Sequence, residues 1–430
     1  MDPKTELQPR SSIEVVASLR VDVVDGPDRG ASVSAGSTIS IGTARDNLVN
    51  VSDVTVSRYH LEVVARPEGI IVNDLGSTNG TYVGSVRIDR ATVPIGTLVT
   101  LGRTTVRFDD AVRTTIAAPT EVQELAGMIA RSQPMLQLFA DVERVAAAPT
   151  STLIVGESGT GKERVAEAIH ARSSRAREPF VTIDCGALSS SLLASELFGH
   201  ERGAFTGADR VHVGAFERAG AGTVFLDEIG ELPPADQSSL LGVLERKRFR
   251  RVGGTAELEL GARVIAATNR DLRAEVNNGR FRHDLYHRLA VIVLRLPPLR
   301  ERPDDILPLI RHFTTELGAT GEIQTLFSAD VLAAWHRRPW WGNVRELRNA
   351  VEAALVIGPG AESEEALASR DEIVRYKDAR ATVVRDFERT YLERIIKAAG
   401  GNVAQAARLA QMDRSHLIDL VARHGLKDRS

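Results

Sequence analysis

The chain has 430 residues, too many for one hydrophobic core, so we expect two to four domains. Its 43% hydrophobic and 26% charged residues are ordinary for soluble globular domains, and a net charge of −3 excludes a global basic field for nucleic acid. Any DNA contact must therefore come from a local patch. The single cysteine, Cys185, excludes a disulfide within the chain. From the polar start and the absence of a long apolar window we expect no secretory signal and no membrane partner, and a cytoplasmic protein.

Residues 12–110 have the pattern of an all-β domain. Short runs rich in Val, Ile and Thr, such as residues 13–24 and 98–108, alternate with turn clusters, such as residues 76–80 (GSTNG). Frequent turns between short strands predict a β-sandwich. The Thr- and Ala-rich residues 111–124 then predict a linker.

Strands alternate with helices over residues 125–298, which predicts an α/β domain with a parallel sheet. Residues 299–358 read as an all-helical lid, residues 359–380 as a second linker, and residues 381–430 as an all-α domain interrupted by two glycines. The fold class predicted is thus multidomain: an all-β sandwich, an α/β domain with a helical lid, and a helical C-terminal domain.

A phosphate-binding loop is predicted where an apolar run, residues 151–155, is followed by GESGTGKE and then by a helical pattern. Glycines let backbone N–H groups curl around a phosphate, the helix N-terminus adds its positive end, and Lys162 supplies a charge to the β- and γ-phosphates. The bland alternative is a glycine turn before a helix. The general motif has Ser or Thr after the lysine to hold magnesium, but this chain has Glu163. The candidate ATP-binding residues of the loop are Gly156, Glu157, Ser158, Gly159, Thr160, Gly161, Lys162 and Glu163.

Two further strands end in polar residues. The apolar residues 223–226 are followed by Asp227 and Glu228, at the strand end where ligands bind in open α/β sheets. Asp227 is suited to hold Mg²⁺, directly or through water, and Glu228 to polarise the attacking water. The alternative is a solvated acidic pair. Asn269 follows a third strand, where its amide can read the γ-phosphate, although such a residue is by itself more often part of a turn.

With these motifs in order, the chain from about residue 125 to residue 357 resembles the central AAA+ domain of sigma-54-dependent activators. GESGTGKE, with Glu after the lysine, is that family's own variant. The string ELFGHERGAFTGA contains the loop by which the family grips sigma-54, which without the family would read as an exposed hairpin turn. The resemblance implies a hexameric ATPase, dependent on ATP and Mg²⁺, that remodels RNA polymerase carrying sigma-54. The loop residues are Gly203, Ala204, Phe205, Thr206, Gly207 and Ala208.

The same resemblance assigns roles to single residues. Arg282 and Arg288, in FRHDLYHRL, would reach the γ-phosphate held by a neighbouring subunit, although alone they would read as surface salt bridges. Arg345, in WWGNVRELRN, would sense the nucleotide. Asp184 replaces the family's usual Asn, which holds the catalytic Glu, here Glu228. Because an ionised Asp cannot donate that hydrogen bond, we expect altered coupling between hydrolysis and the sigma-54 loop, with ATP binding intact.

The strings SRYH (residues 57–60) and NDLGSTNGTYV (residues 73–83) resemble the forkhead-associated (FHA) domain, a β-sandwich that binds phosphothreonine peptides through loops at one end. The family's arginine usually follows Gly42 directly, but Thr43 stands there, and Arg45 is the expected substitute. His60 is expected to brace a loop. The alternative is that the domain binds an unphosphorylated partner or packs on the ATPase. The residues expected at the phosphopeptide are Arg45, Ser57, Arg58, Thr78 and Asn79.

The C-terminal helices resemble a Fis-type helix-turn-helix. Arg414, Ser415 and His416 open the second helix of the pair, where base edges are read. Residues 385–430 hold nine Lys or Arg against six Asp or Glu, so the local charge supports DNA binding only weakly. The alternative is a helical dimerisation cap without DNA contact.

Two functional hypotheses follow. In the first, a phosphothreonine signal from a Ser/Thr kinase reaches the FHA domain, and an ATPase assembled on upstream DNA activates transcription. In the second, the ATPase domain is a nucleotide-dependent scaffold that recruits phosphoprotein partners without productive turnover. The complete set of predicted catalytic residues favours the first, and Asp184 is the one observation for the second.

Overall fold

The computed structural model describes residues 12–66, 69–117, 121–187 and 190–357, together with seven separate residues between 392 and 417. Residues 1–363 form one compact unit and residues 364–430 a second. The predicted base-reading residues Arg414, Ser415 and His416 lie outside the described residues. In the part that is described, no helix has the length and apolar character needed to cross a membrane.

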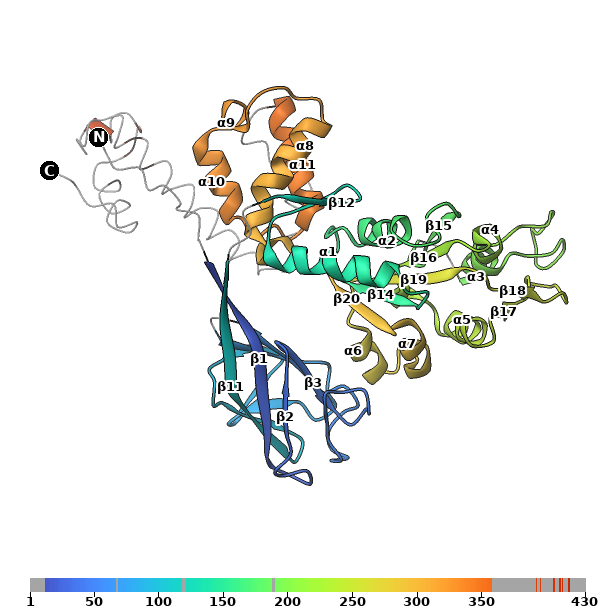
Figure 1. Ribbon diagram of the computed structural model, residues 1–430, viewed down its shortest axis with the longest axis horizontal. Coiled ribbons are helices and arrows are strands. Elements are labelled where there is room, and N and C mark those ends of the chain that lie inside the picture. The colour runs from blue at the N-terminus through green and yellow to red at the C-terminus, as the bar shows by residue number, and fades with distance from the viewer. Residues whose placement is uncertain are drawn as a thin grey trace. The chain divides into compact units, whose positions relative to one another are not determined.

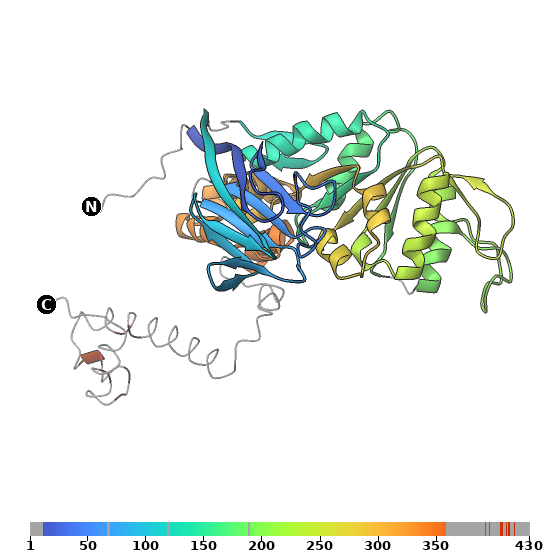
Figure 2. The ribbon, with the colours of Figure 1, turned by 90° about the horizontal axis from the view of Figure 1, so that it is seen from below.

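The N-terminal domain is a sandwich of two β-sheets (Figure 2). Alternate residues of its strands point into one shared core, as Leu19 and Val21 do from the first strand. The six-stranded sheet has the order β2 (Ser32–Ala35), β1 (Ser12–Asp25), β11 (Thr104–Ala117), β10 (Leu98–Leu101), β7 (Thr81–Val83) and β8 (Val86–Ile88). The five-stranded sheet has the order β4 (Val49–Asn50), β3 (Thr38–Gly42), β5 (Leu61–Arg66), β6 (Gly69–Asp74) and β9 (Arg90–Val93).

Two stretches of this domain differ from the sequence-based expectation. Residues 98–108 form two strands rather than one, because Gly102, at a φ of 58°, turns the chain between β10 and β11. Residues 111–117, expected in a linker, continue β11 as far as the pair Ser12–Ala117. The ladder with β1 explains this, since pairing supplies the backbone hydrogen bonds that a free linker would take from water.

The second domain is built on a parallel sheet with the order β15 (Phe180–Asp184), β16 (Thr223–Asp227), β19 (Arg263–Thr268), β14 (Thr152–Val155) and β20 (Ile292–Arg295). Figure 1 shows helices on both faces of this sheet. Successive residues of β16 accordingly enter different cores: Phe225 packs in one hydrophobic cluster, Val224 and Leu226 in the other. A strand buried on both faces explains the continuous apolar runs in the sequence.

The elements around the sheet include two small hairpins and a separate helical lid. The lid has its own core, which contains the fully buried Trp340. The helices and 3-10 turns that flank the sheet are α1 (Gln133–Ala146), α2 (Lys162–Ala171), α3 (Ser190–Phe198), α4 (Ala215–Ala219), η1 (Ile229–Glu231), α5 (Pro234–Arg246), α6 (Leu272–Asn277) and α7 (His283–Leu289). The hairpins pair β12 (Gln123–Leu125) with β13 (Met128–Ala130), and β17 (Arg248–Phe249) with β18 (Leu258–Glu259). The lid follows η2 (Leu299–Glu301) and η3 (Pro303–Asp305) and consists of α8 (Ile306–Glu316), α9 (Ile323–Leu326), α10 (Ala329–Arg337) and α11 (Asn343–Ile357).

Candidate functional site

The predicted nucleotide residues lie together at the carboxyl edge of the parallel sheet. β14 ends at Val155 and leads into the phosphate loop, while β16 ends at Asp227 and β19 at Thr268. Gly161 has a φ of 107°, a conformation that glycine adopts freely, and it places Lys162 at the start of α2. Glu163 is exposed in the first turn of that helix. The arrangement of strand, glycine loop and helix N-terminus is suited to an anion.

Lys162 is a buried cation at this edge. Its side chain is only 6% exposed, and Nζ donates to the carbonyl oxygen of Gly156 at 3.1 Å. Nζ also lies 3.5 Å from a carboxylate oxygen of Glu228. The second carboxylate oxygen of Glu228 accepts from the backbone N–H of Asn269 at 3.2 Å. The Glu228 carboxylate thus contacts both Lys162 and the backbone of Asn269.

Glu228 itself has a left-handed backbone, with φ 47° and ψ 46°. For a residue with a Cβ this conformation costs about 1–2 kcal/mol, and such strain is found at functional sites. Burial raises the pKa of the neighbouring Asp227, and the Glu228 carboxylate raises it further. Two adjacent carboxylates in a half-buried site are a donor set that fits Mg²⁺, because the cation would relieve their repulsion.

Asp184 lies beside these carboxylates in the sheet. It is the β15 residue paired with Asp227. Its Oδ1 accepts from the backbone N–H groups of Gly186, at 2.8 Å, and Ala187, at 3.2 Å. Asp184 also contributes to the raised pKa of Asp227. The side chain therefore stabilises the turn after β15, a role for which a carboxylate suffices.

The lid contacts the phosphate loop through residues that the sequence analysis did not single out. The buried Asn343 donates from Nδ2 to the carbonyl oxygen of Ser158 at 3.0 Å, and its Oδ1 accepts from the N–H of Leu299 at 2.8 Å. Arg300 pairs with both carboxylate oxygens of Glu157, which lowers the pKa of that carboxyl. Asn343 stands inside the string WWGNVRELRN, quoted above for Arg345, and Arg300 stands in residues 296–306 (LPPLRERPDDI). The sequence does not mark the partner of either residue.

The predicted sensor Arg345 joins the same contact. Its Nη1 donates to the hydroxyl of Ser158 at 3.3 Å, and its backbone N–H donates to the carbonyl oxygen of Gly159 at 3.3 Å. A Cβ on Gly159 would lie 2.4 Å from the carbonyl oxygen of Gly342. The lid therefore packs directly against the backbone of the loop, and a change in the loop reaches the lid without an intermediate element.

The predicted sigma-54 loop, residues 203–208, projects away from the sheet between α3 and α4 (Figures 1 and 2). Gly203 and Gly207 have φ values of 79° and 97°, and the N–H of Gly203 donates to the carbonyl oxygen of Ala208 at 2.8 Å, closing the loop. Thr206 is exposed at the tip. Phe205 is partly buried, with its ring centroid 4.9 Å from that of His200. The loop thus presents a hydroxyl while holding its aromatic ring against its own base.

The two predicted trans-acting arginines lie apart from these residues. Arg282 precedes α7 and pairs with Asp284 at 2.7 Å, and it also donates to the hydroxyl of Ser238 at 3.2 Å. Arg288 is exposed in the last turn of the same helix. The Arg282 side chain therefore contacts Asp284 and Ser238 rather than Lys162 or Glu228 of the same chain.

The predicted phosphopeptide residues gather at one end of the sandwich, and all five are exposed or partly exposed. The hydroxyl of Ser57 accepts from the N–H of Thr78 at 3.0 Å, and the amide of Asn79 donates to the carbonyl oxygen of Thr55 at 2.8 Å. Arg45 and Arg58 lie on adjoining loops, since the N–H of Ala44 donates to the carbonyl oxygen of Arg58. His60 is buried and braces these loops: its Nδ1 accepts from the N–H of Ser57, and its Nε2 lies 3.2 Å from the carbonyl oxygen of Gly80.

The loops at this end also contact α6 and α7 of the α/β domain. Tyr59 is fully buried, and it packs in the same hydrophobic cluster as Tyr286. Asn277 accepts from the N–H of Tyr59 and donates to the carbonyl oxygens of both Tyr59 and Leu75. The Tyr59 hydroxyl lies 3.2 Å from Nε2 of His287. Of the alternatives weighed for the sandwich, packing on the domain predicted to be the ATPase is thus seen in the structure.

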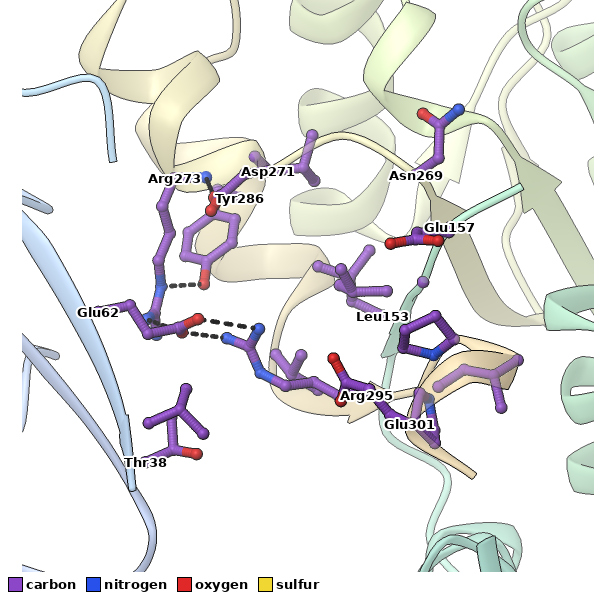
Figure 3. A pocket seen from close by; sticks show the side chains of 18 of the residues that line it. Thr38, Glu62, Leu153, Glu157, Asn269, Asp271, Arg273, Tyr286, Arg295 and Glu301 are labelled. Atoms are coloured by element: carbon purple, nitrogen blue, oxygen red, sulfur yellow. Dashed lines mark hydrogen bonds and ion pairs between the residues drawn. The ribbon is translucent and has the colours of Figure 1, made fainter. Parts of the chain in front are cut away.

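A cavity of about 370 Å³ lies between the sandwich and the edge of the parallel sheet (Figure 3). Glu62 lines it from the sandwich side and pairs with Arg295 and, at 3.9 Å, with Arg273. Gly156 and Asn269 of the nucleotide site line the cavity, whereas Lys162 and Asp227 do not. The cavity therefore adjoins the nucleotide site from the side of the sandwich and is not the phosphate site itself.

Comparison with protein families gives four matches along the chain. A model described as "Sigma-54 interaction domain" matches residues 128–295, and an "AAA+ ATPase lid domain" matches residues 300–371. An "FHA domain" matches residues 39–102. A model described as "Bacterial regulatory protein, Fis family" matches residues 383–418. The order of the four agrees with that predicted from the sequence.

Similar proteins are bacterial regulators. The chain is 45% identical over 273 residues to the Nif-specific regulatory protein of Azospirillum brasilense, covering 64% of this chain and 41% of that one. It therefore spans about two fifths of the length of that relative. It is 41% identical over 304 residues to the transcriptional regulatory protein ZraR of Escherichia coli, covering 69% of this chain and 68% of ZraR.

Among solved structures, NtrX from Brucella abortus in complex with ATP superposes with a TM-score of 0.50 at 34% identity, covering 69% of each chain. NtrX has also been solved with ADP. The match to ZraR spans most of both proteins, and the four family models account for every predicted domain. The chain therefore belongs to the sigma-54 activators, with an FHA domain, an AAA+ domain and its lid, and a Fis-type helix-turn-helix.

Proposed function

We propose that this chain hydrolyses ATP in a ring of identical subunits and uses the energy to remodel RNA polymerase carrying sigma-54. One observation supports the proposal. The same domain holds the predicted nucleotide residues, gathered at the carboxyl edge of its sheet, and the projecting loop that contains Thr206. A phosphate bound in the glycine loop would take the place of Glu228 beside Lys162. The Glu228 carboxylate would then be free to orient water. Asp227 would hold Mg²⁺, which when bound would offset the charge of the phosphates.

Assembly enters the proposal through Arg282 and Arg288. In the structure Arg282 makes its contacts around α7 rather than at Lys162, which supports action on a nucleotide held by a neighbour. An arginine supplied in trans is worth about 10³–10⁵ in rate in GTPases. Turnover per subunit should therefore rise with protein concentration, with a hexamer as the expected ring.

A mixing experiment tests this arrangement. Lys162→Ala and Arg282→Ala should each abolish turnover, but a one-to-one mixture should recover up to about a quarter of the wild-type rate, since about one interface in four then pairs an intact lysine with an intact arginine. Arg311→Ala, an exposed arginine of α8, is the matched control and should turn over normally. A mixture that stays inactive would show that Arg282 does not act across subunits.

Transcription separates the activator from the scaffold. With sigma-54 polymerase, ATP and a promoter carrying an upstream site, the wild type should give transcripts, and Thr206→Ala should turn over ATP without giving them. If the wild type turned over no ATP at any concentration, the nucleotide-dependent scaffold would be the better account.

We further propose that the sandwich reads a phosphothreonine protein. The clustering of Arg45, Ser57 and Arg58 supports this, because charge-assisted hydrogen bonds from exposed guanidinium groups suit a phosphate. Titration with a phosphothreonine peptide should show binding that the unmodified peptide lacks, and equal binding of the two would refute phosphate recognition. Tyr59, next to Arg58, is buried against α6 and α7, so a bound peptide would act directly on the helix that carries Arg288.

The helix-turn-helix match supports a DNA contact near the promoter, for which Arg414, Ser415 and His416 are the proposed base readers. Replacing Arg414 by Ala should weaken binding to the specific site by about 1–3 kcal/mol, which is about 5- to 150-fold. Unchanged binding would favour a dimerisation cap.

A further inference from the structure

Where the sandwich meets α7, three side chains of metal-ligand type converge. His283 and His287 stand one turn apart on that helix, and Asp46 comes from the phosphopeptide end of the sandwich. One ligand atom from each lies within 4.8 Å of the others, and no other such group of three occurs among the residues that the structure describes. The nucleotide and sigma-54 functions make no use of these three residues.

The two imidazoles are already arranged around a shared position. Their Nε2 atoms are 2.9 Å apart, and the ring planes are nearly perpendicular, with centroids 4.3 Å apart. Two lone pairs, or two N–H groups, would repel at this distance, so a proton or a cation must lie between the nitrogens. Zn–N bonds of about 2.0–2.1 Å hold two ligating nitrogens about 3.3 Å apart in tetrahedral geometry, so the rings need to separate by only a few tenths of an ångström.

Asp46 adds the negative charge that a cation needs. Its Oδ2 accepts from the hydroxyl of Tyr59 at 3.0 Å and lies 4.0 Å from Nδ1 of His287. Tyr59, which is fully buried, holds the carboxylate from one side, and Asp46 is otherwise exposed.

We propose that Asp46, His283 and His287 bind a divalent transition-metal ion such as Zn²⁺ and that this ion fastens the sandwich to α7. Two imidazoles and one carboxylate, with water completing the shell, are a ligand set that Zn²⁺ accepts. Asp46 is 237 residues from His283 in the chain, so the ion cross-links two domains. The helix that the ion would hold is α7, which begins after Arg282 and contains Arg288. The proposed metal site therefore lies on the helix that is proposed to reach the neighbouring subunit.

The test uses the full chain without a histidine tag, stripped with a chelator and titrated with Zn²⁺ by calorimetry and with Co²⁺ by visible absorption. The wild type should bind one ion per chain, with a tetrahedral Co²⁺ spectrum. Asp46→Asn, His283→Asn and His287→Asn should each weaken binding at least about tenfold. His312→Asn, a histidine of the lid helix α8, is the matched control and should bind as the wild type does.

Circular dichroism of each variant shows whether it is folded, and metal affinity is read without reference to ATP turnover, so the result stands whatever the outcome for the proposed ATPase. No stoichiometric uptake by the wild type would overturn the site. Asp46→Asn binding as tightly as the wild type, with both histidine variants impaired, would overturn the link between domains.

Discussion

Replacing Asn343 tests how the lid is fixed to the phosphate loop. Its Oδ1 accepts from the N–H of Leu299, a residue with no exposed surface, so truncation leaves a buried donor without its partner. That costs about 1–3 kcal/mol. Asn343 also has a φ of 56°, where Ala is strained and Gly is not. We therefore expect Asn343→Gly to lower the free energy of lid unfolding by about 1–3 kcal/mol, and Asn343→Ala by about 1 kcal/mol more.

The chain offers a specific probe for this measurement. Its three tryptophans, Trp335, Trp340 and Trp341, all belong to the lid. Denaturation followed by tryptophan fluorescence therefore reports the lid alone, which matters because a chain of several domains does not unfold in one step. ATP affinity, measured in parallel, should fall in both variants, because the same amide holds the carbonyl group of Ser158.

The outcomes are distinct. Equal losses for Gly and Ala would mean that backbone strain at this position is negligible. A lid transition within about 0.5 kcal/mol of the wild type for Asn343→Ala would refute the reasoning, since it would mean that water replaces every bond the amide makes.

Three further predictions follow from single contacts. Burial acts to raise the pKa of Asp53, but hydrogen bonds from neighbouring hydroxyl and N–H groups hold it below the ordinary value of 3.8. Its contribution to stability is then present above that pH and is lost as the pH falls through the folded pKa. Asp53→Asn should therefore speed exchange of the Arg103 amide hydrogen at pH 7, because the free energy of opening that amide falls by about 1–3 kcal/mol. The difference in exchange rate between the variant and the wild type should become smaller in acid. An equal difference at both pH values would contradict this. Gly159→Ala should weaken ATP binding about fivefold or more, because Gly159 has a φ of 75° and the new Cβ would meet the carbonyl oxygen of Gly342. Calorimetry with ATP measures the affinity, and an unchanged value would contradict the prediction. Asp184→Asn should change the ATPase rate while leaving ATP affinity intact, and an unchanged rate together with unchanged activation would end the idea of altered coupling.

Much of the candidate site was predictable because its residues are placed by local rules. A short apolar run predicts a strand, parallel strands end at the same edge of a sheet, and Asp227, Asn269 and the glycine loop each follow such a run. The helix beginning at Lys162 has the same origin, since the glycines before it leave the strand at a sharp turn. Local spacing alone was enough to bring these groups together.

Other features depend on pairing between distant segments, for which local pattern holds no signal. The strand that continues to Ala117 exists because β1 lies beside it. Asn343 and Arg300 read as parts of a lid until the fold places them against the phosphate loop, more than 140 positions earlier.

The sequence by itself was enough to predict the four regions that the family models match, the glycine loop after β14, the carboxylates at the end of β16 and the exposed loop at residues 203–208, because each is written in residues close together along the chain. The tertiary structure alone decided that Tyr59 is buried against α6 and α7 and that Asp46 faces His283 and His287. The physical reason is that such contacts arise from how two folded surfaces meet, and the side chains involved have no periodicity or spacing that marks them beforehand.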